Sequence, residues 1–249
     1  MMPVQVYFIG AGPGDVELLT IKGKRIIEQA DVIIYADSLV NPEICSLAKQ
    51  GAEIYGSAKL CLEEITEIIL HSVAQGKVIA RIHSGDPAIF GALLEQMAIL
   101  ENSGISYEVV PGVSSVFAAA AALQAELTAP DISQTVIISR ITGRTKVPRT
   151  EKLSDLASHQ ATLVLFLSVT MIEEVVRELI SGGYSEDTPT AVVYKASWKD
   201  EIIVRSTLKE VAEKVRAYRI QNQALILVGK ALDPQLKAQG STRSKLYER

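Results

Sequence analysis

Short apolar runs alternate with amphipathic segments along most of the chain, and this alternation restricts the fold more than any other feature. The runs 6–9, 32–35 and 78–82 are rich in valine and isoleucine and have the length of buried strands. Between them, residues 18–30 and 62–75 carry apolar side chains at helical spacing. Alternating strands and helices predict a mainly parallel sheet that is covered by helices.

Glycine-containing loops follow three of the expected strands, at residues 10–15, 84–87 and 111–115. Ligands of open α/β sheets bind outside the carboxyl ends of the strands, so we expect the three loops to line one crevice. Pro87 suits the first turn of a helix, which we expect to run to about Ser103.

The first loop, residues 10–15, differs from a dinucleotide-binding loop. Glycine lets the backbone approach a ligand closely. The dinucleotide fingerprint, however, needs a glycine three positions after Gly12, where this chain has Asp15. Pro13 also removes an N–H group that would bind a pyrophosphate. The loop therefore predicts close contact with a ligand of another kind.

The alternation continues in the second half of the chain, with strands expected at 135–139, 162–167, 190–194 and 224–228. Residues 126–133, which contain Pro130, are the best candidate for a linker. We therefore expect two α/β domains with parallel or mixed sheets, residues 1–130 and residues 131–249, and a polar tail from about residue 233.

Composition argues against several classes of function. The formal net charge is 25 − 29 = −4 and the pI is about 5.5, which disfavours a nucleic-acid-binding protein. No apolar run approaches the ~20 residues that span a bilayer. Cys45 and Cys61 form neither a metal motif nor a disulfide framework, so we expect a cytoplasmic protein without a metal site.

Several polar residues near the loops have both a structural and a functional interpretation. Asp86 is either the N-cap of the helix expected at Pro87 or a ligand contact that accepts hydrogen bonds from ribose hydroxyls or a cationic group. Ser114 and Ser115 form either a turn with an N-cap or part of a ligand site. His83 lies beside Asp86, but no second histidine stands at metal-binding spacing from it.

Residues 140–152 hold five basic residues and one acid, Glu151. Such a run is either a solvated face or a site for an acidic small molecule, which Arg140, Arg144 and Arg149 would bind through charge-assisted hydrogen bonds.

Five motifs together resemble the tetrapyrrole methylases, a family of two-domain enzymes that use S-adenosylmethionine. The motifs are GAGPGD, RIHSGDPAIFG, VVPGVSS, TLVLFLSVT and TAVVYKASWKDE, at residues 10–15, 81–91, 109–115, 162–170 and 190–201. The resemblance reaches to about residue 230. It implies the α/β fold of this family, with a cofactor cleft between two domains, and a homodimer.

Two further segments, YADSLVNPEI at 35–44 and GRTKVP at 143–148, resemble the branch that methylates carbon 11 of precorrin-4 or cobalt-precorrin-4 in corrin biosynthesis. Other branches act on uroporphyrinogen III, precorrin-2 or precorrin-3. The segment at 143–148 discriminates better, because DSLV is partly shared with the uroporphyrinogen enzymes. Whether the substrate carries cobalt stays open.

The resemblance also implies roles for individual residues. The expected cofactor contacts are Pro13, Ser84, Gly85, Asp86, Ile89, Ser114, Ser115, Leu167 and Ala196. The expected substrate contacts are Gly12, Gly14, Asp15, Arg140, Arg144 and Arg149. Asp37 matches an aspartate on the tetrapyrrole side and is the candidate catalytic residue, with Lys59 as a weaker candidate. Two departures from many relatives are Ser84 in place of glycine and Leu167-Ser168 in place of Met-Gly.

The implied reaction transfers a methyl group from the sulfonium of the cofactor to an electron-rich ring carbon of a tetrapyrrole polycarboxylate. The protein aligns the reactants and excludes water, and it needs no covalent intermediate. Two alternatives remain: a nucleotide-dependent oxidoreductase, which only the first glycine loop supports, and a tetrapyrrole carrier that binds no methyl donor.

Overall fold

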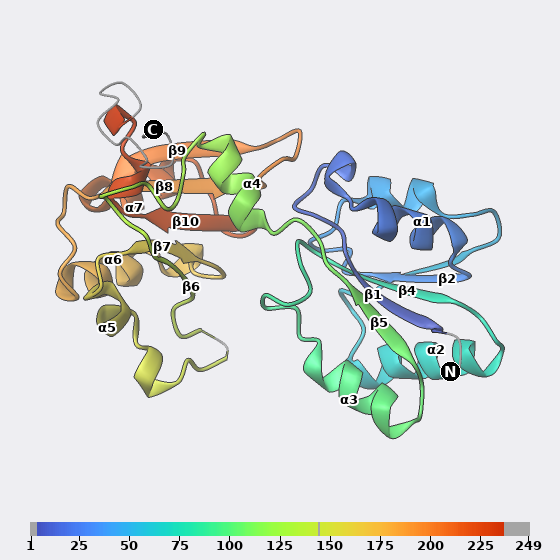
Figure 1. Ribbon diagram of the computed structural model, residues 1–249. Helices are drawn as coiled ribbons and strands as arrows, with labels where there is room; N and C mark the ends of the chain where they lie inside the picture. The colour runs from blue at the N-terminus through green and yellow to red at the C-terminus, as the bar shows by residue number, and fades with distance from the viewer. Residues whose placement is uncertain (1–3, 144, 237–249) are drawn as a thin grey trace, which may run out of the picture. The chain divides into compact units, whose positions relative to one another are not determined.

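The computed structural model describes residues 4–143 and 145–236, and the chain divides into two compact units, Met1–Ser115 and Val116–Arg249 (Figure 1). The division lies ahead of the boundary that we expected at residue 130. The reason is α4 (Ser115–Ala122), whose buried Val116 and Ala119 belong to the core of the second unit. Leu127, from the segment expected to be a linker, belongs to the same core.

The first unit contains a five-stranded parallel sheet with the order β3-β2-β4-β1-β5. Its strands are β1 (Val6–Gly10), β2 (Val32–Tyr35), β3 (Glu53–Gly56), β4 (Ile79–His83) and β5 (Tyr107–Val110). Its helices are α1 (Ile21–Gln29), α2 (Leu62–Ala74) and α3 (Leu94–Asn102), with short 3-10 turns at Val16–Leu18 and Pro42–Leu47.

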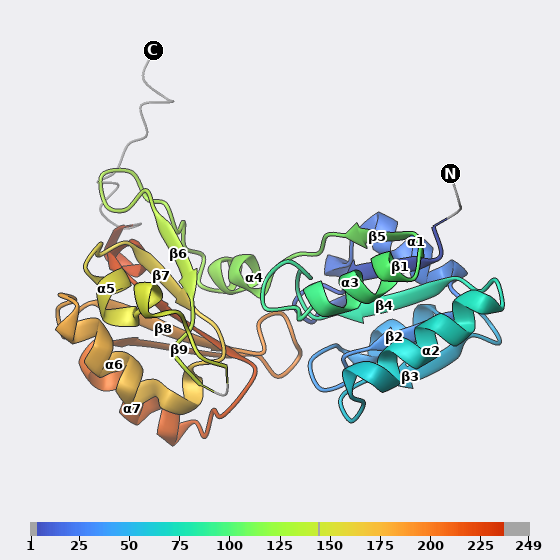
Figure 2. The ribbon, with the colours of Figure 1, turned by 90° about the horizontal axis from the view of Figure 1, so that it is seen from below.

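Alternating side chains of these strands belong to two cores, one on each face of the sheet. The helices α2 and α3 lie in front of this sheet in Figure 2. Ile9 and Ile82 pack with Ile27 of α1 on one face. Phe8 and Ile79 belong to the other core, which also contains buried residues of α2 and α3. This two-sided burial explains why the strands read as continuous apolar runs.

The strand ends of the first sheet are aligned. Gly10 at the end of β1 pairs with His83 at the end of β4, and Tyr35 at the end of β2 pairs with Ile82. Because all five strands run in the same direction, the loops that follow them leave from one edge of the sheet.

The second unit contains a mixed sheet with the order β6-β7-β10-β8-β9. Only β6 and β7 are parallel; the other neighbours are antiparallel. The strands are β6 (Val136–Ser139), β7 (Thr162–Leu165), β8 (Pro189–Tyr194), β9 (Ile202–Thr207) and β10 (Ala224–Val228). Residues of α5 (Leu153–Ala157), α6 (Ile172–Ser181) and α7 (Leu208–Ala217) pack on one face, and α4 packs on the other. Short 3-10 turns lie at Arg149–Glu151, Val169–Met171 and Lys230–Leu232.

The predicted fold class, two α/β units with parallel and mixed sheets flanked by helices, is confirmed. The helix expected from Pro87 is wrong in its start, since α3 begins only at Leu94. Phe90 and Ala92 have φ angles of 54° and 47°, which a right-handed helix does not contain. Among the described residues, no helix is both long and apolar enough to cross a membrane.

Candidate functional site

Three glycines bring the loops after β1, β4 and β5 into direct backbone contact. A Cβ atom on Gly112 would lie 2.2 Å from the carbonyl oxygen of Gly85 and 2.7 Å from the Cα of Gly10. A Cβ on Gly10 would lie 2.6 Å from the Cα of Gly112 and 2.6 Å from the carbonyl oxygen of Gly85. Side chains do not fit at these positions, so the three loops meet main chain to main chain, as their places at the strand ends predict.

The first two loops are also joined by a pair of hydrogen bonds. The N–H of Gly12 donates to the carbonyl of Gly85 at 3.2 Å, and the N–H of Gly85 donates to the carbonyl of Gly12 at 2.8 Å. Both glycines have positive φ angles, 77° and 62°, where a side chain would be strained. Glycine adopts these φ angles without that strain.

Asp86 fastens the second loop to the third. One carboxylate oxygen accepts a hydrogen bond from the N–H of Ala88, and the other accepts one from the N–H of Gly112, both at 2.9 Å. The capping interpretation of Asp86 thus applies to a turn and not to a helix. Ser115 is the first residue of α4, and its nitrogen lies 3.6 Å from the Cβ position of Gly85. Ser114 beside it is buried.

The end of the first loop contacts the loop after β2. Asp15 accepts a hydrogen bond from the N–H of Glu17 and caps the turn at Val16–Leu18. The carbonyl of Gly14 accepts one from the side chain of Asn41 at 2.9 Å. Sequence reasoning did not single out Asn41, although its place before Pro42 is typical of an N-cap, which it also provides by accepting from Glu43.

Asp37 is exposed in the turn after β2, and its position is fixed from the neighbouring strand. Its carboxylate accepts a hydrogen bond from the N–H of Ala58 at 2.6 Å. A Cβ on Gly56 would lie only 2.8 Å from the carboxyl carbon, so Asp37 packs against bare backbone. Lys59, the weaker candidate, is exposed in the turn after β3.

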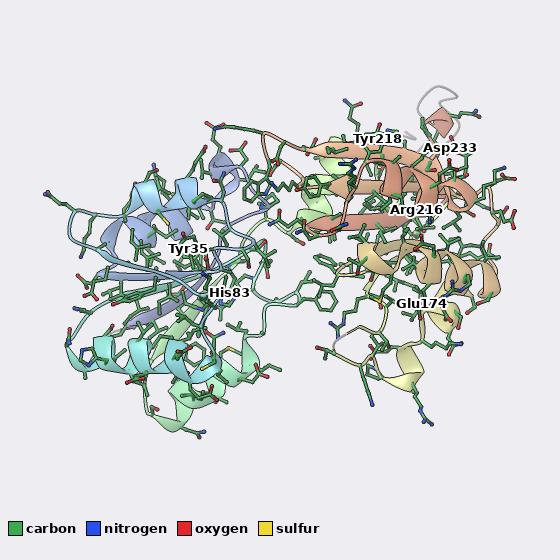
Figure 3. The ribbon with its side chains drawn as sticks, turned by 180° about the vertical axis from the view of Figure 1, so that it is seen from behind. Tyr35, His83, Glu174, Arg216, Tyr218 and Asp233 are labelled. Carbon is green, nitrogen blue, oxygen red and sulfur yellow. The ribbon has the colours of Figure 1, made fainter. Side chains whose placement is uncertain are left out.

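Two basic side chains of β4, Arg81 and His83, are buried behind these loops. Burial lowers the pKa of the Arg81 guanidinium to about 10. Burial, and to a smaller extent the charge of Arg81, lowers the pKa of His83 to about 3, so its ring is neutral at physiological pH. His83 and Tyr35 lie at the same end of the first sheet (Figure 3). Burial likewise raises the pKa of the Tyr35 hydroxyl.

In the second unit, Leu167 and Ala196 follow the ends of two strands, β7 and β8, on the same side of the sheet as the start of β10. Both follow strands that run antiparallel to β10, so the ends of β7 and β8 lie beside the start of β10. Leu167 is 60% exposed and has a φ angle of 52°. Ala196 is buried between Lys195 and Ser197, whose φ angles are 48° and 69°. Such strained non-glycine residues gather at functional sites.

Lys195 was not singled out by sequence reasoning. Its ammonium lies 5.2 Å from the ring centre of Trp198 and 2.6 Å from the carboxylate of Asp200. The hydrogen bond to Asp200 raises the pKa of Lys195.

The basic segment 140–152 begins beside Leu167. The N–H of Ile141 donates to the hydroxyl of Ser168 at 3.0 Å, and this hydroxyl donates to the carbonyl of Phe166 at 2.6 Å. Ser168, one of the departures from the family pattern, thus ties the segment to the end of β7.

The basic side chains of this segment differ in their surroundings. The guanidinium of Arg140 donates to the carbonyl of Thr145 at 2.8 Å. Arg149 is exposed at the start of the turn Arg149–Glu151, and Lys152 lies 3.7 Å from Glu178. Arg144 lies outside the described residues.

Comparison with known proteins identifies the family. The family model described as "Tetrapyrrole (Corrin/Porphyrin) Methylases" matches residues 5–212. The chain is 56% identical to a cobalt-precorrin-4 C(11)-methyltransferase of Methanocaldococcus jannaschii over 98% of this chain and 93% of that protein. It is 46% identical to a precorrin-4 C(11)-methyltransferase of Pseudomonas aeruginosa over 97% of this chain and 94% of that protein.

Solved structures agree with this match. An X-ray structure of a cobalt-precorrin-4 methyltransferase has a TM-score of 0.90 and 53% identity, and covers 92% of this chain and 96% of that chain. A uroporphyrin-III C-methyltransferase from Thermus thermophilus, solved in complex with S-adenosylhomocysteine, has a TM-score of 0.77 and 30% identity, and covers 92% of this chain and 98% of that chain. The chain belongs to the tetrapyrrole methylases.

Proposed function

We propose that this protein is an S-adenosylmethionine-dependent methyltransferase of cobalamin biosynthesis that methylates carbon 11 of cobalt-precorrin-4. The product is cobalt-precorrin-5, released together with S-adenosylhomocysteine. The observation that carries the proposal is the 56% identity, over nearly the whole chain, to a relative with this named activity. The metal-free substrate, precorrin-4, is the second candidate, because a relative named for it is 46% identical.

We propose the cofactor contacts that the resemblance to the family implies. In the first unit, these are Pro13, Ser84, Gly85, Asp86, Ile89, Ser114 and Ser115. In the second unit, they are Leu167 and Ala196. The glycine contacts support this assignment, because loops without side chains at these positions let a ligand approach the backbone closely. A relative solved in complex with S-adenosylhomocysteine supports the choice of cofactor.

The residues of this chain fit a reaction that is governed by positioning. When bound, S-adenosylmethionine supplies a methyl group on a cationic sulfur that leaves readily. The loop at 10–15 provides a rigid wall, because Gly12 is bonded to Gly85 and Gly14 to Asn41. Asp86 holds the second and third loops together. A rigid wall keeps the ring carbon, the methyl group and the sulfur in line and excludes water.

Asp37 is our candidate for the carboxylate that faces the reacting ring. It is exposed, and the N–H of Ala58 fixes one of its oxygens. A fixed carboxylate orients a pyrrole N–H or stabilises positive charge that develops on the ring during methyl transfer.

The substrate carries several carboxylates, and the basic segment 140–152 is the site that we propose for them. Arg140, Arg144 and Arg149 supply planar guanidinium groups, which bind carboxylates in a bidentate manner. Gly12, Gly14 and Asp15 complete the proposed substrate contacts on the first unit.

The decisive experiment is incubation of the protein with a ¹³C-methyl donor and precorrin-4, with and without cobalt, followed by carbon NMR of the product. We expect label at carbon 11 and faster turnover of the cobalt form. Label at another ring position contradicts the proposed reaction but leaves the family membership intact.

Binding measurements separate the remaining alternatives. A tetrapyrrole carrier would not bind S-adenosylhomocysteine in a calorimeter, and an oxidoreductase would be stabilised against heat by NADH instead. We further propose a cytoplasmic homodimer; sedimentation equilibrium at several concentrations tests the assembly.

A further inference from the structure

Two buried hydrogen bonds connect β4 to the loop at residues 87–93 through the side chains of Arg81 and Gln96, and we call this pair of bonds the relay. Arg81 on β4 and Gln96 on α3 are only 6% and 5% exposed. The Nε of Arg81 donates a hydrogen bond to the side-chain oxygen of Gln96 at 3.1 Å. The side-chain nitrogen of Gln96 donates in turn to the carbonyl of Ala92 at 3.0 Å. The relay therefore fixes the backbone at residue 92.

The start of the relay is itself firmly held. The guanidinium of Arg81 also donates to the carbonyl of Ile34 on β2 at 3.3 Å and to the hydroxyl of Ser57 at 3.1 Å. All three acceptors are neutral, so these bonds fix the orientation of the guanidinium without neutralising it. His83, two residues further on the same face of β4, is buried as well. Arg81 thus acts on the loop through Gln96.

The loop that they hold is strained. Phe90 and Ala92 have φ angles of 54° and 47°, and neither is a glycine. A Cβ on Gly91 would lie 2.2 Å from the carbonyl oxygen of Pro87, so the loop folds tightly back on itself. Strained backbone persists only where the surroundings determine it, and it gathers at functional sites. The relay provides that determination from the buried side.

The strained backbone sets the orientation of two neighbouring residues, Ile89 and Phe90. Asp86 directly precedes the loop and Ile89 lies in it, and both belong to the proposed cofactor site. Phe90, the next residue of the loop, is 47% exposed. If the backbone at 91–92 relaxed toward a helix, residues 89 and 90 would turn with it. The relay side chains are too deeply buried to act on a ligand themselves.

We propose that Gln96 is a positioning residue that acts through the carbonyl of Ala92 and holds residues 87–93 in the conformation that binds the methyl donor. This inference rests on the proposed function, since only that function assigns Asp86 and Ile89 to the cofactor site. Arg81 serves by orienting the amide of Gln96, so that its oxygen faces the guanidinium and its nitrogen faces the loop.

The variant Gln96→Glu tests this role. A carboxylate keeps the acceptor for Arg81 but has no hydrogen to donate to Ala92. We expect the midpoint of thermal unfolding to stay at or above that of the wild type, because the buried guanidinium gains a charged acceptor. We expect the dissociation constant of S-adenosylhomocysteine, measured by calorimetry, to rise about threefold to tenfold, as the loss of one hydrogen bond predicts. Hydrogen exchange should become faster in 87–93 and stay unchanged in β4.

Gln134→Glu is the matched control. It makes the same change of charge. It also removes a hydrogen bond of the same kind, which the side-chain amide of Gln134 donates to the carbonyl of Thr128 at 2.9 Å in the second unit. Its affinity should equal that of the wild type.

The outcomes separate the two proposals. A wild type that does not bind S-adenosylhomocysteine overturns the proposed function. A wild type that binds it, with Gln96→Glu binding equally well, overturns the positioning role alone. If Gln96→Glu does not fold, Gln96→Met replaces it; this variant has similar volume and should also weaken binding, and wild-type affinity there would again refute the role.

Discussion

Replacing Gly112 by alanine should damage the meeting point of the three loops. The added Cβ would lie 2.2 Å from the carbonyl oxygen of Gly85 and 2.7 Å from the Cα of Gly10, and both neighbours are backbone atoms. Since ordinary contacts begin near 3.4 Å, the loops must separate by roughly 1 Å. Overpacking of this kind costs about 3 kcal/mol at the upper end of its range.

Part of this cost is offset in the unfolded chain. Alanine has less backbone freedom than glycine, which stabilises the folded state by about 0.4–1 kcal/mol. The net loss is therefore about 2 kcal/mol. For a chain of this length, each kcal/mol lowers the unfolding midpoint by about 2–4 °C, so we expect a decrease of about 4–8 °C.

The assay is thermal unfolding followed by circular dichroism, together with calorimetric titration of S-adenosylhomocysteine. Gly143→Ala is the matched control, because its Cβ would meet only the terminal carbon of Met171, at an ordinary 3.5 Å. That variant should unfold at the wild-type temperature or slightly above it. If Gly112→Ala unfolds within about 1 °C of the wild type and binds with unchanged affinity, the three loops do not depend on this contact and our reasoning is refuted.

Three further variants test other features. Asp86→Asn replaces an oxygen that accepts a hydrogen bond from Gly112 or Ala88 by an NH2 group that cannot accept one. We expect the free energy of unfolding, measured with denaturant, to fall by about 1.5–3 kcal/mol and cofactor binding to weaken. Unchanged stability would show that the two bonds contribute nothing. Arg149→Ala should raise the KM for the tetrapyrrole, by about 1–3 kcal/mol expressed as free energy, and leave the KM for the methyl donor unchanged; equal KM values for the substrate would remove Arg149 from the site. His83→Asn should make stability less sensitive to acid. The folded-state pKa of His83, about 3, lies below its ordinary value of 6.5, so as pH falls the unfolded state takes up the proton first and the wild type loses stability. Relative to the variant, it should lose about 2 kcal/mol between pH 7 and pH 5 in urea titrations, and parallel pH profiles would contradict the burial of a neutral ring.

The strands of the first sheet were predictable because their apolar content has a direct physical cause. Ile9, Ile33 and Ile82 face one core while Phe8, Ile34 and Ile79 face the other, and strands buried on both faces are mostly apolar. The parallel direction of the strands then follows from the intervening helices. It brings the glycine loops to one edge, so the meeting of those loops was also predictable.

The loop at 87–93 was not predictable, because the hydrogen bonds that hold it depend on a side chain of β4. Asp86-Pro87 is a regular helix-start signal, and nothing in the local sequence indicates positive φ angles at Phe90 and Ala92. The hydrogen bonds that hold this loop involve Gln96, four residues after Ala92, and Arg81 on β4, which binds Gln96. The same holds for α4, whose alanine-rich sequence has no polar face that would indicate which sheet it covers.

The backbone contact among Gly10, Gly85 and Gly112 also limits how such a chain can change its substrate. An insertion of one residue into any of the three loops would displace the other two, so their lengths can change only together. The segment at 35–44, which is one of two that distinguish this branch by resemblance, lies outside that contact. New substrate preferences are therefore expected to arise in segments that are free to vary in length, while the glycine loops keep a fixed number of residues.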